Sequence, residues 1–171
     1  MLNSIKGIPH RPMASLWLPI CLLIFAIGTD QLTKIAASRI LAHSGDIPLL
    51  GGLVKFSLIE NHEGFLGIVR GLPPKLQFFF LYVCVAFLLI CCLAYLLFLS
   101  RKNSRYDIPL ALATGGGLSN LMDRIHNDGG VTDFMIIAVG SLRTGIFNLA
   151  DVYILAGSFV FGFLFFSRPG K

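Results

Sequence analysis

The sequence predicts an all-α membrane protein with four transmembrane helices and a small β-element outside the membrane. Of its 171 residues, 55% are hydrophobic and only 13% are charged, whereas soluble domains average about 25% charged residues. Long uncharged runs recur, at residues 12–29 and again at 76–100, and about 20 apolar residues suffice to cross the hydrocarbon core. The net charge of +5 then fits basic cytoplasmic flanks better than an acidic partner. No pattern typical of a nucleic-acid-binding module occurs.

Transmembrane helices are expected at residues 15–36, 76–100, 107–125 and 146–167, so that residues 1–171 form a single integral membrane domain. The first apolar run is longer than the ~7–15 residues of a signal-peptide core and leads into a polar motif, which favours an uncleaved helix. In the third helix, Pro109 lies near the first turn, where its missing N–H costs little. Gly115-Gly-Gly117 in the same helix permits close helix contact or simply loosens the helix.

Two extracytoplasmic segments, 37–75 and 126–145, are expected between these helices. Residues 53–60 alternate apolar and polar side chains, which is typical of a half-buried strand. Residues 131–137 suit a second strand that could join the first in one small sheet. The tract from Glu63 to Arg70 is compatible with a short interfacial helix.

The distribution of charge predicts the orientation. With four spans, both termini and the 101–107 loop lie on one side of the membrane. Their charged residues sum to +6, against −1 for the rest of the chain. The positive-inside rule therefore places both termini in the cytoplasm. The charged residues of this side are Lys6, Arg11, Arg101, Lys102, Arg105, Asp107, Arg168 and Lys171.

This orientation brings the notable carboxylates to one depth. Asp30 and Asp123 lie at the outer ends of the first and third helices, and Asp151 lies in the outer first turns of the fourth. Asp133 is in the outer loop between the last two. Ionisable groups at membrane depth are costly and usually functional. We therefore expect a polar site near the outer interface.

Residues 115–151 contain four aspartates and a repeated pattern, Asn120-Leu-Met-Asp123 and Asn148-Leu-Ala-Asp151. Two carboxylates that share a site cannot both ionise easily. The ionised one can activate water while the protonated one polarises a carbonyl, as in aspartic proteases. The repeat by itself favours Asp123 and Asp151 as the pair, with the asparagines orienting carboxylates or binding substrate backbone. Because the histidines and cysteines lack metal-ligand spacing, neither a metal nor another cofactor is expected.

Structural roles compete with this chemistry at each aspartate. Asp30 and Lys34 are spaced for an ion pair on one helix face. Asp123 beside Arg124 could form a polar helix terminus, and Asp151 could merely complement the helix dipole. Asp133 could be a solvated strand residue. A fifth aspartate, Asp128, precedes two glycines and suits a turn.

In combination, four short motifs resemble the lipoprotein signal peptidase (signal peptidase II) family. They are Asp30-Gln-Leu-Thr-Lys34, Gly116-Gly-Leu-Ser-Asn120-Leu-Met-Asp123-Arg124, Val131-Thr-Asp133-Phe134 and Phe147-Asn148-Leu-Ala-Asp151. The resemblance covers nearly the whole chain. It implies an intramembrane aspartyl endopeptidase, multi-pass in the bacterial inner membrane, with its active site near the periplasmic face. It also implies cleavage of a prolipoprotein on the N-terminal side of its diacylglyceryl-modified cysteine.

Carried over by position, the resemblance assigns catalysis to Asp133 and Asp151, not to Asp123. It assigns substrate-binding or supporting roles to Asp30, Lys34, Asn61, Asn120, Asp123, Arg124 and Asn148. The expected partners are the lipidated prolipoprotein and membrane lipid, and a monomer is expected.

Two residues depart from the family pattern. Glu63 stands where a glycine is usual after Asn61, and Ser119 replaces the glycine that usually precedes Asn120. The altered loop leaves open a paralogue with a different membrane substrate. A small proton-coupled transporter and a noncatalytic assembly or binding protein are the alternatives from other classes.

Overall fold

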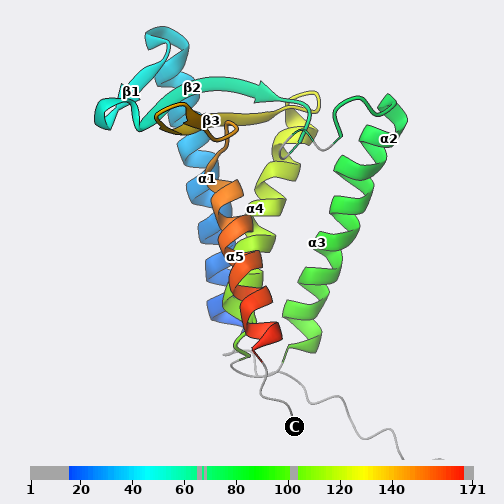
Figure 1. Ribbon diagram of the computed structural model, residues 1–171. Helices are drawn as coiled ribbons and strands as arrows, with labels where there is room; N and C mark the ends of the chain where they lie inside the picture. Colours follow the sequence, from blue (N-terminus) through cyan, green and yellow to red (C-terminus); the bar gives the residue numbers. More distant parts are fainter. Residues whose placement is uncertain (1–15, 65–66, 68, 101–103, 168–171) are drawn as a thin grey trace, which may run out of the picture.

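The computed structural model describes residues 16–64, 67, 69–100 and 104–167. Its helices stand side by side, and a small sheet lies across one end of them (Figure 1). Two π-helical turns, Phe79–Cys84 and Tyr95–Leu99, make one continuous helix of Pro74–Leu99. The helices are α1 (Trp17–Ser44), α2 (Pro74–Phe78), α3 (Val85–Ala94), α4 (Asp107–His126) and α5 (Leu149–Phe166). The strands are β1 (Ile47–Leu49), β2 (Val54–Asn61), β3 (Val131–Val139) and β4 (Leu142–Arg143).

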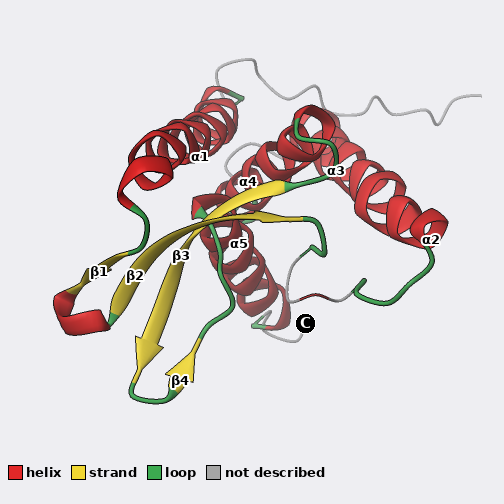
Figure 2. Cartoon of the chain, turned by 90° about the horizontal axis from the view of Figure 1, so that it is seen from above, coloured by secondary structure: helices red, strands yellow, loops and turns green. Residues whose placement is uncertain are grey.

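Within the described residues, three helices are long and apolar enough to cross a membrane: α1, Pro74–Leu99 and α5. At 20 residues α4 has a comparable length, but it combines three glycines with polar and charged residues in its last turns. Its position explains this composition, because α4 stands in the middle of the other helices (Figure 2). A helix surrounded by protein does not need an apolar surface on every side. The predicted fourth span therefore remains a prediction.

Three consecutive glycines let α4 approach its neighbours closely. A Cβ on Gly115 would lie 2.8 Å from the Cβ of Ala26 in α1, and one on Gly116 would lie 2.5 Å from the carbonyl oxygen of Ala150 in α5. Gly117 faces α3 in the same way. Small residues at helix contacts are typical of membrane bundles. The contact role predicted for these glycines is thus confirmed, and it brings the first turn of α5 against α4.

The four strands form one antiparallel sheet in the order β1-β2-β3-β4 (Figure 2). Ile59 of β2 is opposite Asp133 of β3, beyond an irregularity in the ladder. The sheet packs on the last turns of α1, where Leu41 and Phe134 belong to one buried apolar cluster. The predicted strands at 53–60 and 131–137, and their union in one sheet, are confirmed.

The first helix is longer than expected. The sequence predicted its end at residue 36, but α1 continues to Ser44 and stops at Gly45, whose φ of +67° favours glycine. The additional turns carry Ala37 and Leu41, which pack beneath the sheet. The helix therefore extends beyond the predicted span because its last turns pack against the sheet, while the predicted start of the extracytoplasmic segment 37–75 remains a prediction.

Some predictions concern residues outside the described part of the chain. The short helix expected between Glu63 and Arg70 includes residues 65, 66 and 68, which lie outside it. The same holds for six of the cations that set the predicted orientation: Lys6, Arg11, Arg101, Lys102, Arg168 and Lys171. Both predictions remain untested.

Candidate active site

A cleft of about 980 Å³ opens between the helix Pro74–Leu99, α5 and the sheet. Most of its lining is apolar, including Phe80, Leu81 and Leu155. Two carboxylates, Asp133 and Asp151, lie in the same lining. Their exposed fractions are only 1% and 8%, so the cleft combines apolar walls with two buried acids.

Backbone pairing brings the two acids together. Asp133 is in β3, and Asp151 is in the first turn of α5. Just before α5, the Phe147 backbone exchanges two hydrogen bonds of 2.9 Å with Met135 of β3. This bridge holds the start of α5 beside the strand. The acids, 18 positions apart in the sequence, consequently face one cleft.

Asn148 connects the two acids directly. It caps α5: its side-chain oxygen accepts the Asp151 backbone N–H at 2.9 Å, and the Asp151 carboxylate accepts the Asn148 N–H at 3.1 Å. This reciprocal arrangement is a capping box. The Asn148 amide nitrogen also donates to Asp133 at 2.7 Å. One fully buried asparagine therefore fixes the positions of both carboxylates.

Asn120 of α4 supports the other side of Asp151. Its amide nitrogen donates to Asp151 at 3.0 Å, and its oxygen accepts from Asn148 at 3.1 Å and from Lys34 at 2.8 Å. Every polar atom of this buried amide is used. The two asparagines thus orient the carboxylates, as the sequence suggested.

Lys34 of α1 is the cation beneath this network. Its ammonium group lies 2.7 Å from Asp30, 2.8 Å from Asp123 and 2.8 Å from the Asn120 oxygen. Three donors meet three acceptors, as a buried ammonium requires. The predicted Asp30–Lys34 ion pair is confirmed, and Asp123 completes the cluster.

Asp30 also holds the start of α5. One of its oxygens accepts the backbone N–H of Ala150 at 2.7 Å, and the other accepts the Ser119 hydroxyl at 2.7 Å. The first N–H groups of a helix have no partner within it. Asp30 satisfies one of them from another helix, immediately before Asp151.

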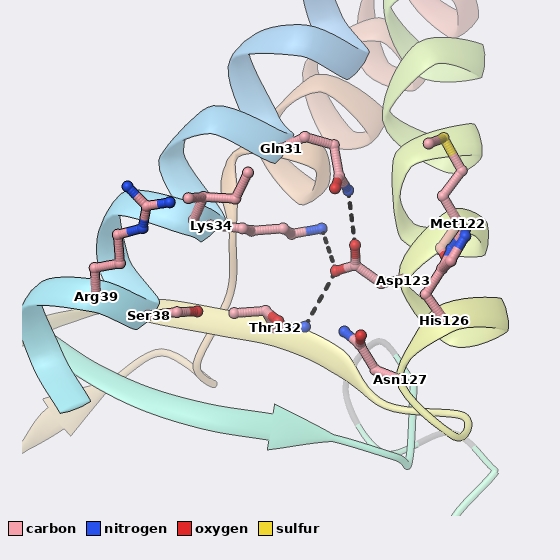
Figure 3. A pocket seen from close by; sticks show the side chains of 10 residues that line it. Gln31, Lys34, Ser38, Arg39, Met122, Asp123, His126, Asn127 and Thr132 are labelled. Carbon is pink, nitrogen blue, oxygen red and sulfur yellow. Dashed lines mark hydrogen bonds and ion pairs between the residues drawn. The ribbon is translucent and has the colours of Figure 1, made fainter.

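Asp123 points away from the cleft and into a second cavity between α1 and α4 (Figure 3). Its carboxylate accepts bonds from Lys34 at 2.8 Å, from Gln31 at 2.7 Å and from the Thr132 backbone N–H at 3.2 Å. These contacts give it a structural position between α1, α4 and β3. The structure thus brings Asp133, and not Asp123, into one cleft with Asp151.

Asn61 of β2 contacts Asp133 from the open side of the cleft. Its amide nitrogen donates to Asp133 at 2.8 Å, and its oxygen accepts the Glu63 backbone N–H at 3.0 Å. The Glu63 side chain forms an ion pair with Arg70 at 2.6 Å. The departure from the family pattern at Glu63 therefore leaves the Asn61 contact in place.

Arg124 brings a positive charge to the cleft wall. Its guanidinium donates to the Asn120 backbone oxygen at 3.4 Å. Its Nε is buried and has no hydrogen-bond partner among the described residues. A buried donor without a partner is costly.

The environment of Asp133 favours its protonated form. The pKa of Asp133 is raised to about 6, mainly by burial and also by the Asp151 charge, although the bonds from Asn61 and Asn148 and the Lys34 charge oppose the rise. Asp133 can therefore exchange a proton near neutral pH. That property suits a group that both gives and takes protons.

Two residues of this network, Gln31 and Ser119, were given no role from the sequence. Gln31 donates to Asp123 and to the Ser119 hydroxyl, at 2.7 and 2.9 Å, and Ser119 is completely buried. The available signal was a polar amide in an otherwise apolar helix beside Asp30. Of the other acids, Asp128 adopts a left-handed turn (φ +47°), as predicted.

In the part of the chain that the structure describes, the side chains that could ligate a metal ion form no cluster. There, no three His, Cys, Asp or Glu side chains lie close enough together to hold an ion. The contacts of Asp133 and Asp151 are amide, backbone and ionic contacts within the protein.

Known proteins resemble this chain along most of its length. A family model described as signal peptidase (SPase) II matches residues 22–167. A lipoprotein signal peptidase of Caldicellulosiruptor bescii is 36% identical over 142 residues, which cover 83% of this chain and 86% of the relative. One of Burkholderia mallei is 32% identical over 142 residues, covering 83% and 82%.

Solved structures share the fold. Two structures of a bacterial membrane enzyme obtained by the in meso method, at 2.3 and 1.9 Å resolution, align with TM-scores of 0.73 and 0.74. Their sequences are 19% and 20% identical to this chain, and the alignments cover 95% of it and 98% and 99% of those chains. The arrangement of helices and sheet is therefore one that a membrane enzyme uses.

Proposed function

The chain belongs to the signal peptidase II family of aspartic peptidases, and we propose that it removes signal peptides from lipid-modified prolipoproteins with Asp133 and Asp151 as its catalytic pair. The substrate is a prolipoprotein whose cysteine carries diacylglycerol, and the cut falls on the N-terminal side of that cysteine. The observation that carries the proposal is the single cleft lined by both buried acids.

The proposed reaction is hydrolysis by a carboxylate and a carboxylic acid. We assign the resting proton to Asp133, whose pKa is raised to about 6. The Asp151 carboxylate takes a proton from water as the water oxygen attacks the scissile carbonyl carbon, and Asp133 donates its proton to the carbonyl oxygen. When the resulting diol collapses, the C–N bond breaks. Asp151 then returns a proton to the leaving nitrogen, and Asp133 recovers one from a diol hydroxyl.

The supporting residues hold this geometry. Asn148 and Asn120 supply the bonds that orient the two carboxylates, while the Asp30–Lys34–Asp123 cluster anchors Asn120 and the start of α5. Preorganised donors of this kind need no rearrangement during the reaction. The Arg124 guanidinium, which belongs to the cleft wall, is suited to a carbonyl oxygen of the extended substrate.

The cleft suits a substrate that remains in the membrane. Its apolar walls come from α5 and from the helix Pro74–Leu99, so acyl chains and an apolar signal peptide can lie between these helices. We place both termini in the cytoplasm of a bacterium and the acids at the periplasmic face of its inner membrane, with α4 as the fourth span. Because one chain supplies every residue of the site, a monomer suffices. Nothing in this arrangement favours the transporter, the noncatalytic protein or the paralogue.

The test is hydrolysis by the purified full chain in detergent. The enzyme is given a prolipoprotein that carries diacylglyceryl-cysteine and, separately, the same precursor without the lipid. Mass spectrometry of the products should show cleavage immediately before the cysteine in the first precursor only. Cleavage of both precursors would contradict the proposed specificity, and cleavage of neither would contradict the activity.

A further inference from the structure

The cavity between α1 and α4 lies behind the proposed catalytic network, on the far side of the Lys34–Asp123 ion pair from the cleft. It has a volume of about 520 Å³. No described residue lines both this cavity and the catalytic cleft. The Lys34–Asp123 ion pair forms its inner wall (Figure 3). A ligand here would therefore be separate from the substrate.

Both walls carry the same order of side chains along the helix axis. On α1, Ile35 is followed one turn later by Arg39, and on α4, Met122 is followed one turn later by His126. Both helices run toward the sheet (Figure 1). The apolar pair therefore lies deeper in the bundle, and the cation and the imidazole lie nearer the sheet.

The deeper part of the cavity is open to the membrane. Ile35 is 48% exposed and Met122 is 40% exposed. Leu32 and Ile125, one position away from lining residues on the same two helices, are more exposed still. Acyl chains can lie along these side chains without displacing any protein contact.

The upper part of the cavity carries a cation without an ionic partner. Lys34 is paired with both Asp123 and Asp30, so that buried cluster offers no free positive charge, whereas Arg39 is exposed and forms no ion pair with any described residue. The Ser38 hydroxyl and the Asn127 amide line the same space. A guanidinium with neighbouring neutral donors is suited to a phosphate group.

We propose that the groove between α1 and α4 is a binding site for an anionic glycerophospholipid, with its phosphate at Arg39 and its acyl chains along Ile35 and Met122. A guanidinium can bind a phosphate through two parallel charge-assisted hydrogen bonds. A free phosphate would use only the upper half of the cavity, a lipid without a phosphate would leave Arg39 without a partner, and a zwitterionic lipid would bring its own cation close to Arg39. The order of apolar and cationic side chains on both walls matches a whole anionic lipid.

Native mass spectrometry of the full chain, released from detergent after incubation with phosphatidylglycerol or phosphatidylcholine, tests the proposal. Wild-type protein should retain more phosphatidylglycerol, and Arg39→Gln should lower this retention about five-fold, the effect of about one surface cation. Arg39→Lys should keep most of it. The matched control is Lys75→Gln, which removes an exposed cation at the start of α2, outside the groove, and should change nothing.

Two further measurements test whether the bound phosphate belongs to a lipid and whether the apolar wall contributes to binding. Inorganic phosphate in excess should fail to displace the lipid, and Ile35→Asn should lower the retention of phosphatidylglycerol. Thermal unfolding in detergent should show that the variants remain folded. Equal retention of the two lipids by the wild-type protein, unchanged retention in Arg39→Gln or displacement by inorganic phosphate would overturn the proposal.

Discussion

The two copies of Asn-x-x-Asp occupy opposite ends of their helices, and this difference gives them different roles. Asn148 and Asp151 begin α5, where backbone N–H groups lack helical partners, so they form a capping box. Asn120 and Asp123 lie in the last two turns of α4, where the backbone N–H groups are already bonded within the helix. Their side chains therefore turn to other elements. The same spacing therefore places Asp151 in the cleft and Asp123 in structural contacts with α1 and β3.

The largest difference is expected between Asp151→Asn and Asp123→Asn. Asp151→Asn removes a proposed proton carrier and should lower kcat at least about a thousand-fold. Asp123→Asn loses one charge from the Lys34 cluster and should lower kcat on the order of ten-fold. Single-turnover cleavage of the diacylglyceryl precursor measures both. Similar losses in the two variants would mean that the two copies share one role.

Lys34→Met should mainly affect stability. It leaves the buried carboxylates of Asp30 and Asp123 facing each other without a cation, at a cost of about 3–5 kcal/mol. The reduction should appear as a lower unfolding temperature in detergent and less protein in the membrane. Adding Asp30→Asn and Asp123→Asn to the same chain should restore part of the loss. A Lys34→Met protein as stable as wild type would show that the Asp30–Lys34–Asp123 cluster does not stabilise the fold.

Substitutions at Asn148 should separate capping from the orientation of Asp133. Asn148→Ser retains an N-cap oxygen but loses the amide that donates to Asp133, so it should keep most of the stability and lose about ten- to a hundred-fold in kcat. Asn148→Ala should show a comparable fall in kcat and an additional loss of about 1 kcal/mol in stability. If Asn148→Ser had wild-type kcat, the amide contact with Asp133 would be irrelevant to the reaction.

The smallest expected effect is a change in pH dependence. Because the active pair needs one proton, kcat/KM of the wild-type enzyme should fall as pH rises through the Asp133 pKa of about 6. The Asn61 bond lowers this pKa, so Asn61→Ala should move the alkaline decline to higher pH. Gln77→Ala, which loses an amide outside the cleft, is the control. A shift to lower pH in Asn61→Ala would contradict the assigned role of this bond.

Local sequence patterns were sufficient for most of the fold and for part of the site. Uncharged runs located the helices, and alternation located β2 and β3, because both signals depend on neighbouring residues. The end of α1 was missed since Ala37 and Leu41 are helical through packing on the sheet. The long-range partner of Asp151 could not be read from spacing, because it depends on the bridge between Met135 and Phe147.

The long-range contacts of the polar network also could not be predicted from local sequence patterns. The Asp30–Lys34 pair follows from i, i+4 spacing, but its contact with the Ala150 N–H joins residues 120 positions apart. Only the resemblance to a family pointed to Asp133, whereas the repeated motif favoured Asp123. The structure favours Asp133 over Asp123, since the Asp123 carboxylate is occupied by Lys34, Gln31 and a β3 backbone N–H.

The most direct test of the catalytic pair is the activity of Asp133→Asn beside Asp128→Asn. Both variants exchange a carboxylate for an amide within five positions, but Asp128 lies in a turn and does not line the cleft. Purified Asp133→Asn should be folded and membrane-inserted, yet should not measurably cleave the diacylglyceryl precursor, while Asp128→Asn should cleave it at the wild-type rate. Full activity in Asp133→Asn would contradict the account.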